Sequence, residues 1–334
     1  MATIKEVSQL AKVSVATVSR VLNGRVPVTE AKRESVLAAV AQLGYQPNVF
    51  ARSLATNRSG GIGVIVNELS SPYYSGVIQG IESVVEAQGM HLLVSSGHAG
   101  RHLEAQAVEF LRQRRPDALI VQLEATSDAD LIAWSGHGLP TVVLGRYIDA
   151  LADRCIHLDN LKGGYLATRH LIDRGHRCIA HIAGKPALKD ARDRLAGYRR
   201  ALHDAGIDYD EALVVEGDFM EEGGQAGMQR LLARDLGFTS VFAANDQSAA
   251  GALLAIRAHG LRVPDDISLI GYDDVLLARY LFPALTTVRQ PFVEMGQAAA
   301  MLALSALSAG DSKEVRRQFD PVLIERTSVA ALQS

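Results

Sequence analysis

The sequence has few of the features that mark several classes of protein. Its 334 residues include two cysteines, Cys155 and Cys178, which lie far apart among apolar neighbours. We interpret them as reduced core residues and not as a disulfide, and because no CxxC spacing occurs we expect no metal site and no cofactor. A membrane-spanning helix needs an apolar stretch of about 18–20 residues. No apolar stretch in this sequence is that long, so no membrane partner is expected.

Signatures of catalysis and of export are also missing. The chain contains no GxSxG, no Walker A loop and no GxGxxG, and its histidines and carboxylates show no recognisable catalytic spacing. The first residues, MATIKE, lead directly into an amphipathic pattern without the apolar segment of a signal peptide. We therefore expect a cytoplasmic protein that is not an enzyme.

Charge is divided unevenly along the chain. Residues 1–60 contain eight Lys/Arg and three Glu, a net charge of +5, whereas the whole chain carries −3, so the remaining residues carry −8. A basic segment joined to an acidic body is the electrostatic pattern of a DNA-binding arm.

Residues 3–23 have the spacing of a helix-turn-helix. The first helix is predicted over residues 4–11, with one buried apolar stripe made of Ile4, Val7, Leu10 and Ala11. Ser14 is a natural N-cap for a second helix, whose buried stripe is Val18, Val21 and Leu22. A third helix is expected from residue 29 or 30 to Gly44, where a glycine and the nearby Pro47 end it.

The second helix presents mostly short side chains to solvent. Its exposed residues are predicted to be Val15, Ala16, Thr17, Ser19 and Arg20. Short side chains let the backbone approach base edges in a major groove, where an apolar group meets a thymine methyl and an arginine reaches guanine or phosphate. An ordinary packed helix pair has the same apolar spacing, and the basic charge of residues 1–60 favours the DNA-reading interpretation.

After residue 60, short apolar strands alternate with helices in two successive sets. The first set has predicted strands at 62–66, 91–96, 118–122 and 141–145, and the second begins at 155–158 and continues at 178–182, 213–215, 240–244 and 268–272. Continuous apolar strands that alternate with helices form a parallel sheet covered on both faces. The pattern predicts two doubly wound α/β lobes, with ligands bound at the carboxyl ends of the strands in the cleft between them.

Polar and aromatic side chains follow these strands. The candidates for ligand contact are Ser71, Tyr73, Tyr74, Arg194, Phe219, Asn245, Asp273 and Gln290. Carboxylate, guanidinium and amide groups bind vicinal hydroxyls, and an aromatic ring stacks on the C–H face of a sugar. A purine can use the same Tyr73 and Phe219 rings, so the residues leave a sugar and a purine open.

Several motifs, taken together and in order, resemble the LacI/GalR family of bacterial transcriptional repressors, and within it the galactose-repressor branch most. They are TIKEV, VSVATVSRVLNG, LGYQPN, ARSLA, FAANDQSAAGAL, ISLIGYDD and LTTVRQP, and the resemblance covers essentially the whole chain. It implies an all-α helix-turn-helix head followed by a two-lobed α/β body like that of periplasmic binding proteins.

The resemblance also implies a division of the chain and a set of partners. A DNA-binding domain is expected over residues 1–47, a hinge helix and linker over 48–60, and an effector-binding and dimerisation domain over 61–334. Its lobes are expected at about 61–160 plus 291–318 and about 161–290 plus 319–334. A homodimer would bind operator DNA, and a small sugar in the cleft would control that binding.

Site residues follow from the same resemblance. The implied DNA contacts are Thr3, Ser14, Val15, Ala16, Thr17, Ser19, Arg20, Asn23, Asn48, Ala51, Arg52 and Leu54, with Leu54 as a minor-groove wedge and Ala51 at the contact between two hinge helices. Matching effector positions are Arg194, Phe219, Asn245 and Asp273. The sequence departs from the pattern at Gln290 and at Gly145, where several relatives carry an acidic group. We include the adjacent Arg146 as a further candidate.

Two other classes of protein compete with a ligand-responsive repressor. An α/β enzyme and an exported sugar-binding protein both account for residues 60–330, but neither has a use for the basic head at residues 1–58. A regulator that responds to a purine or nucleoside as corepressor also stays open.

The hinge interpretation gives the first prediction, for Leu54→Ala. An apolar wedge contributes by unstacking a base step and bending the duplex, so its loss weakens binding where DNA shape matters. Binding to a specific operator is expected to weaken by at least about tenfold, which is about 1.4 kcal/mol, while binding to random duplex stays nearly unchanged. Titration of both duplexes at one salt concentration measures this, and equal losses on the two would contradict the wedge.

Overall fold

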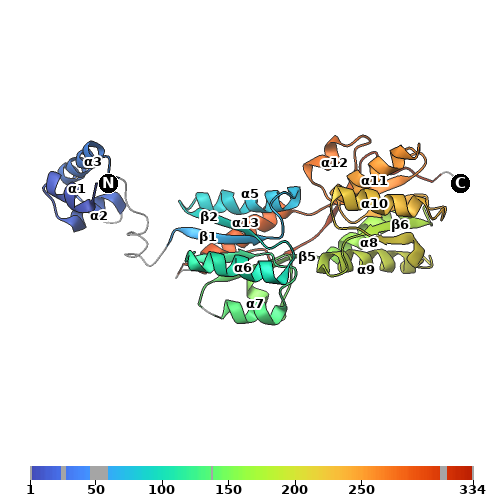
Figure 1. The fold of residues 1–334 in the computed structure, drawn as a ribbon, viewed down its shortest axis with the longest axis horizontal. Coiled ribbons are helices and arrows are strands. Elements are labelled where there is room, and N and C mark those ends of the chain that lie inside the picture. Colours follow the sequence, from blue (N-terminus) through green and yellow to red (C-terminus); the bar gives the residue numbers. More distant parts are fainter. Residues whose placement is uncertain (1, 24–27, 46–58, 137, 309–313, 333–334) are drawn as a thin grey trace. The chain divides into compact units, whose positions relative to one another are not determined.

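The computed structural model describes residues 2–23, 28–45, 59–136, 138–308 and 314–332. Contacts divide the chain into two compact units, residues 1–60 and 61–334, and each is described by itself (Figure 1). The hinge candidates Asn48, Ala51, Arg52 and Leu54 lie outside the described residues. In the part of the chain that is described, no helix is both long and apolar enough to cross a bilayer.

Three helices make up the described part of the first unit: α1 (Ile4–Leu10), α2 (Val15–Asn23) and α3 (Glu30–Leu43). Their shared core consists of Val7, Ala11, Val18, Val36 and Ala39. The helix-turn-helix expected from the sequence is therefore present, with the third helix packed against it.

Local hydrogen bonds fix where these helices begin and end. The Thr3 hydroxyl accepts from the Glu6 N–H while the Glu6 carboxylate accepts from the Thr3 N–H at 2.7 Å, a capping box at the start of α1. The Ser14 hydroxyl accepts from the Thr17 N–H at 3.1 Å, which confirms Ser14 as the cap of α2. Gly44 ends α3 with φ +56°, a left-handed conformation that suits glycine.

Leu10 was predicted to be buried, and this prediction is wrong. The side chain of Leu10 is 42% exposed, whereas Val7 and Ala11 are buried. A helix turns about 100° per residue, so Leu10 lies on the opposite side of Val7 from Ala11 and Ile4. In a helix this short the core covers only the face that those three residues share.

The second unit contains two six-stranded sheets, which confirms the expected two-lobed α/β body. The first sheet has the order β11-β5-β4-β3-β1-β2 and the second β12-β10-β9-β8-β6-β7. The strands of the first are β1 (Gly61–Val66), β2 (His91–Ser96), β3 (Ala118–Val121), β4 (Thr141–Leu144), β5 (Cys155–Leu158) and β11 (Gln318–Phe319). Those of the second are β6 (Ile179–Ala183), β7 (Val214–Glu216), β8 (Ser240–Ala243), β9 (Ser268–Asp273), β10 (Thr286–Arg289) and β12 (Val322–Ile324).

Helices cover both faces of each sheet (Figure 1). The first lobe has α5 (Pro72–Glu86) and α13 (Phe292–Ser305) on one face and α6 (Arg101–Gln113) and α7 (Asp128–Ser135) on the other. The second lobe has α8 (Asn160–Asp173) and α9 (Lys189–Asp204) opposite α10 (Glu221–Leu232) and α11 (Asp246–Ala258). Because successive strand residues point to opposite faces, Val64 and Ile65 enter two different hydrophobic clusters.

Three details differ from the expectation. Residues 155–158 do not open the second set of strands, because β5 pairs with β4 and β11 in the first sheet. Residues 286–289 form a strand parallel to β9, and β12 pairs with it in the antiparallel sense. A short helix that the pattern did not indicate, α12 (Leu276–Tyr280), lies between β9 and β10.

The chain passes between the lobes three times: after β5, after β10 and after β11. Lys162, just beyond the first passage, forms an ion pair at 2.7 Å with Asp320 in the third. Each lobe therefore contains segments that are distant in sequence, and an ion pair joins the chain at the first passage to the chain at the third.

The contact between α5 and α13 generates a prediction for Gly80→Ala. A Cβ at Gly80 would lie 2.1 Å from the carbonyl oxygen of Val293, and a Cβ at Gly296 would lie 2.3 Å from that of Val77. The helices must separate to admit a methyl group there, so the free energy of unfolding is expected to fall by about 1–3 kcal/mol.

Gly136→Ala is the matched control for that substitution. Its added Cβ has no neighbour closer than 3.4 Å, and its φ of −75° suits alanine. Urea denaturation of both variants decides the point, and equal midpoints would show that the α5–α13 approach does not depend on Gly80.

Candidate functional site

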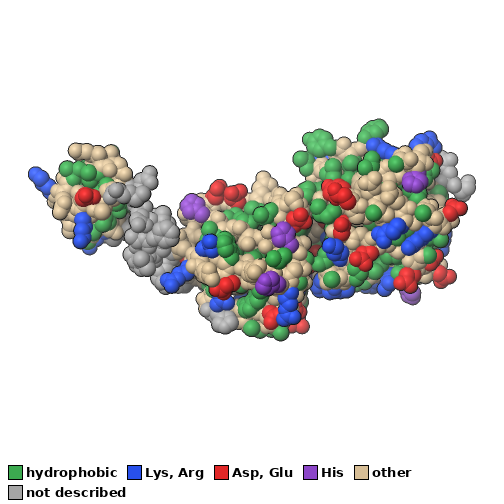
Figure 2. Space-filling model, in the orientation of Figure 1, with side chains coloured by type: hydrophobic (Ala, Val, Ile, Leu, Met, Phe, Trp, Pro, Cys, Tyr) green, Lys and Arg blue, Asp and Glu red, His purple; other side chains and the backbone are tan. Residues whose placement is uncertain are grey.

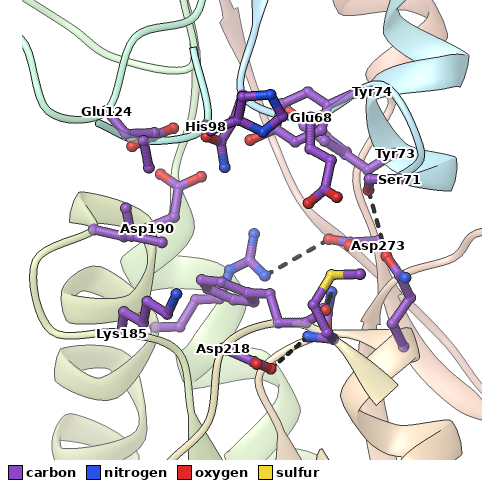
Figure 3. Close-up of a pocket in the computed structure, with 18 of the residues that line it drawn as sticks. Glu68, Ser71, Tyr73, Tyr74, His98, Glu124, Lys185, Asp190, Asp218 and Asp273 are labelled. Atoms are coloured by element: carbon purple, nitrogen blue, oxygen red, sulfur yellow. Dashed lines mark hydrogen bonds and ion pairs between the residues drawn. The ribbon is translucent and has the colours of Figure 1, made fainter. Parts of the chain in front are cut away.

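A cavity of about 200 Å³ lies where the carboxyl ends of strands from both lobes meet, a volume that suits a small molecule (Figure 3). Loops after β1, β2 and β3 supply one side, and loops after β6, β7, β8, β9 and β10 supply the other. This is the position at which doubly wound sheets bind ligands. Its lining is Asn67, Glu68, Ser71, Tyr73, Tyr74, His98, Ala99, Glu124, Lys185, Leu188, Asp190, Arg194, Asp218, Phe219, Met220, Asn245, Gln247, Asp273 and Gln290.

The structure brings eight of the nine effector candidates together around this cavity: Ser71, Tyr73, Tyr74, Arg194, Phe219, Asn245, Asp273 and Gln290. Arg146 is not in this lining. Its guanidinium donates to the carbonyl oxygens of Leu123 and Thr126 and to the carboxylate of Asp128. Because protein acceptors hold it, we do not include Arg146 among the proposed ligand contacts.

Arg194 is the buried cation of the site. Its Nε donates to Asn160 Oδ1 at 3.0 Å and its Nη1 donates to the Ala244 carbonyl at 2.6 Å. The guanidinium carbon lies 3.7 Å from the centre of the Tyr272 ring. Contacts on the edge and the face of the group fix its plane, so Arg194 presents a fixed set of donors to the cavity.

Asp273 is the acid that accompanies this cation. Its carboxylate lies 3.6 Å from Arg194 Nη1 and accepts from Gln290 Nε2 at 2.6 Å. Burial raises the pKa of Asp273 to about 6, with Arg194 and the Gln290 hydrogen bond opposing the shift. At neutral pH the group is therefore mainly a carboxylate with an oxygen available to ligand donors.

The backbone is strained where Asp273 enters the cavity. Asp273 has φ +108° and Asp274 has φ +58°, conformations that cost free energy for residues with a side chain. Asp274 is held by Arg289 at 2.8 Å and by Arg326. These ion pairs keep the turn after β9 in the conformation that aims Asp273 at Arg194.

Asn245 and Phe219 form a second fixed unit on the same side. The side-chain Oδ1 of Asn245 caps α11 by accepting from the Ser248 N–H, and its Nδ2 donates to the Phe219 carbonyl, both at 2.9 Å. Phe219 has φ +70°, and its ring packs where a Cβ at Gly184 would lie 2.3 Å away. Asn245 thus holds the strained turn that sets the Phe219 ring at the cavity wall.

The opposite wall comes from the start of α5. Tyr73 receives a hydrogen bond from Gln122 at 3.4 Å and packs edge-on against Tyr74 and Phe292. Ser71 donates to Gln247 Oε1 at 3.3 Å, a contact from the first lobe to the second. The cavity is therefore bridged by a neutral hydrogen bond at one edge.

Several lining residues were not selected from the sequence: Asn67, Glu68, His98, Glu124, Lys185, Asp190, Asp218 and Gln247. The same rule would have found most of them, since Asn67 follows β1, His98 follows β2 and Glu124 follows β3. Asp190 has no such signal, because it lies in the first turn of α9.

Glu124 is placed by a buried carboxylate beneath it. Glu104 Oε1 accepts from the N–H groups of Glu124 and Ala125 at 2.8 and 2.9 Å, and its Oε2 accepts from the Thr126 N–H and hydroxyl at 2.7 and 2.6 Å. Arg146 binds carbonyl groups of the same loop. Glu104 takes the donors and Arg146 the acceptors, so the loop of residues 123–126 has a fixed conformation.

The DNA-binding candidates in the first unit occupy two kinds of position. Val15, Ala16 and Arg20 are exposed, whereas Thr17 and Ser19 are half-buried, so the prediction of exposure is wrong for the last two. Thr3 and Ser14 make the caps described above, and Asn23 is the last residue of α2. Exposed short side chains at the start of α2 remain available to a nucleic acid.

Among the described residues there is no cluster of three or more His, Cys, Asp or Glu side chains that suits a metal ion. His98 and His102 are four residues apart, but α6 begins only at Arg101, so the two do not share a helical face.

Comparison with known proteins agrees with both units. A family model described as bacterial regulatory proteins, lacI family, matches residues 3–48, and a periplasmic binding protein-like domain matches residues 168–329. The chain is 42% identical over 330 residues to the HTH-type transcriptional regulator GalR of Escherichia coli (strain K12), with 99% of this chain and 96% of that protein covered.

Two solved structures are similar over nearly the whole chain. The lac repressor dimer bound to operator and the anti-inducer ONPF is 33% identical with a TM-score of 0.88, covering 99% of both chains. A complex of the transcriptional regulator CelR with cellobiose is 34% identical with a TM-score of 0.72, covering 98% of this chain and 100% of the other.

The loop beneath the cavity generates a prediction for Glu104→Gln. Glutamine offers an NH₂ group where Oε2 now accepts from Thr126, which leaves a buried N–H without an acceptor. Hydrogen bonds to a charged group contribute roughly 1.5–3 kcal/mol each, so a loss of about 2 kcal/mol in unfolding free energy is expected. Amide hydrogen exchange at residues 124–126 should also quicken.

Glu109→Gln, on the exposed side of the same helix, is its control and should change neither quantity. Unchanged exchange at residues 124–126 in Glu104→Gln would mean that Glu104 does not hold the loop.

Proposed function

Because this chain belongs to the LacI family of bacterial regulatory proteins, we propose that it is a dimeric transcriptional repressor whose operator affinity is set by a small sugar bound between the two lobes. The observation that carries the sugar assignment is the buried Arg194–Asp273 pair beside the Phe219 ring. We propose that it acts in the cytoplasm, where its DNA is, and that the cavity binds its ligand without transforming it.

The cavity suits a neutral polyol. Asp273 and Gln290 offer oxygen acceptors, Arg194 offers donors, and each can engage two neighbouring hydroxyls. Phe219 supplies an apolar face for the C–H side of a sugar ring, with Tyr73 on the opposite wall. Five carboxylates and two cations line the cavity (Glu68, Glu124, Asp190, Asp218, Asp273; Lys185, Arg194), an excess of negative charge that disfavours a phosphorylated ligand.

Reading of DNA is assigned to the start of α2. Val15 and Ala16 are exposed and short, so the helix can approach base edges, and Arg20 lies within reach of guanine or phosphate on the same helix. Four further contacts are proposed for residues outside the described part of the chain. Ala51 is proposed as the contact between two hinge helices and Leu54 as the minor-groove wedge. Asn48 and Arg52 are proposed to contact the DNA backbone.

A dimer is supported by an apolar surface on the second lobe. Leu254 on α11 and Leu276 and Tyr280 on α12 are 56%, 65% and 78% exposed, and the neighbouring Phe282 is 83% exposed. Apolar side chains gather over α12 in Figure 2. Large exposed apolar groups on neighbouring elements mark a protein interface, and a second copy of the chain is the proposed occupant.

A ligand between two lobes can control a DNA-binding head by changing how the lobes close. A sugar that prefers one closure shifts the population toward it, and if that arrangement separates the two heads of a dimer, operator affinity falls. By thermodynamic linkage, operator DNA must weaken sugar binding by the same factor. A purine that stacks on Tyr73 and Phe219 and strengthens operator binding is the alternative.

A thermal-shift and operator-binding experiment tests this proposal. The full chain is mixed with D-galactose, D-glucose, D-ribose, cellobiose, adenine and hypoxanthine, and titrated onto an operator selected from a random duplex pool. One sugar is expected to stabilise the chain and weaken operator binding. Stabilisation by a purine that strengthens operator binding would replace the sugar assignment.

Asp273→Ala is the variant for the site. Loss of a hydrogen bond to a charged group costs roughly 1.5–3 kcal/mol, or about 10–100-fold in sugar affinity, while operator affinity without ligand should hold. The exposed Asp208→Ala serves as control. A normal sugar response from the Asp273 variant would remove this residue from the site.

A further inference from the structure

Two carboxylates from different lobes face one another at one end of the cavity. Glu124 belongs to the loop after β3 in the first lobe, and Asp190 belongs to the first turn of α9 in the second (Figure 3). They are also the two residues that this cavity shares with a neighbouring one lined by Gly145, Arg146, Lys189 and Arg192, among others. Glu124 and Asp190 therefore stand between the two cavities.

The backbone that carries Glu124 and the carboxylate of Asp190 are both held in place. Glu104 and Arg146 fix the loop that carries Glu124. Asp190 accepts from Asn160 Nδ2 at 3.0 Å, and Asn160 also accepts from Arg194. Like charges on two such rigid supports repel, and the repulsion opposes closure of the lobes unless a donor or a proton lies between them.

We propose that Glu124 and Asp190 form a specificity-determining subsite that the ligand bridges with hydroxyl or amino donors, and that Glu104 is its positioning residue. This inference rests on the proposed function, because it assigns an orientation and a chemical class to the same ligand. A carboxylate or phosphate on that part of the ligand is rejected.

A second observation supports a ligand that donates hydrogen bonds. Asn67 Oδ1, in the same wall of the cavity, is buried and accepts no hydrogen bond from the described residues. Buried acceptors without a donor are rare in folded proteins. Together with Glu124 and Asp190 it makes the lining of the cavity rich in acceptors.

Titration gives the subsite a measurable signature. Burial first, and then Asp190, raise the pKa of Glu124 to about 7, and burial also raises that of Asp190. The charged and titratable groups around Glu124 are Asp190, Glu104, Arg146, Arg194 and Tyr74. A carboxyl group whose pKa is raised by folding destabilises the fold as the pH rises from its ordinary value of 4.5 toward 7, and fully above that.

The first experiment uses the full chain without ligand. Glu124→Gln, Asp190→Asn and the double variant are unfolded thermally at pH 8 and pH 4.5. At pH 8, Glu124→Gln is expected to raise Tm, and this gain should be smaller in the Asp190→Asn background, where only the contribution of burial remains, whereas at pH 4.5 it should be absent in both. Glu109→Gln is the matched control. Equal gains in the two backgrounds would overturn the coupling between the carboxylates.

The second experiment measures binding of D-galactose and D-galacturonate by calorimetry from pH 5.5 to 8.5. A donor ligand favours the carboxylate, so galactose affinity should rise by up to about tenfold per pH unit until about pH 7 and then level. Galacturonate should bind at least about a hundredfold more weakly at pH 8, with affinity that falls as the pH rises.

Glu124→Gln should flatten both pH profiles above about pH 6, the pKa of Asp273, and reduce the discrimination against galacturonate by about tenfold, while Glu109→Gln should change neither. Galactose binding with an unaltered pH slope in Glu124→Gln would overturn the subsite.

Failure of the two proposals can be told apart. If no sugar binds, the proposed function fails, and the ligand-free comparison still decides whether Glu124 and Asp190 interact. If galactose binds and weakens operator binding, but galacturonate binds as tightly as galactose, the proposed function holds and the subsite is wrong. Glu104→Gln supplies the positioning test: its galactose affinity should fall with a weaker pH dependence, and an unchanged profile would remove that role.

Discussion

The buried guanidinium of Arg194 constrains most of the second lobe. A charge with a side chain only 4% exposed is costly unless it is hydrogen-bonded and paired. Here Asn160 and the Ala244 carbonyl accept its hydrogen bonds, and Asp273 forms an ion pair with it. Asn160 begins α8, Ala244 directly follows β8 and Asp273 ends β9, so all three elements must be correctly placed for the cation to be satisfied. The ligand site is thus built from groups that also hold the fold.

Close helix packing makes that arrangement possible. A Cβ at Gly164 would lie 2.2 Å from the Arg194 carbonyl oxygen, and a Cβ at Gly197 would lie 2.1 Å from that of Leu161. Glycine at these positions lets α8 and α9 approach until Arg194 reaches Asn160. The requirement is steric, since a side chain on either helix would move the guanidinium away from its acceptors.

Much of the fold followed from the sequence because strands buried on both faces are continuous apolar runs, and most of the cavity followed because ligand residues come just after them. What could not be predicted depends on distant contacts. Leu10 belongs to an apolar stripe but lies off the face that the core covers. Arg146 follows a strand, but its guanidinium donates hydrogen bonds to backbone carbonyl oxygens that no local pattern reveals. Asp190 enters the cavity through the packing of α9, which spacing does not encode.

Electrostatics divides the cavity into two ends with different physical character. Around Arg194 and Asp273 the opposite charges balance, and the groups are fixed in a conformation that costs backbone strain at Asp273 and Phe219. Around Glu124 and Asp190 the charges are alike and come from different lobes, so this end responds to whatever lies between the lobes. A fixed recognition end and a responsive end are what a receptor needs if binding is to alter its shape.

The three passages between the lobes also affect how the chain folds during synthesis. The edge strand β11 and the helix α13, which completes one face of the first lobe, come from residues 292–319, after nearly all of the second lobe. When β5 has just left the ribosome, the first sheet therefore lacks its edge strand β11, and one of its faces is covered by α5 without α13. Ribosomes add about 5–20 residues per second, so the residues between β5 and α13 take roughly 7–27 s to synthesise. During that time the first lobe has exposed apolar surface to which chaperones can bind.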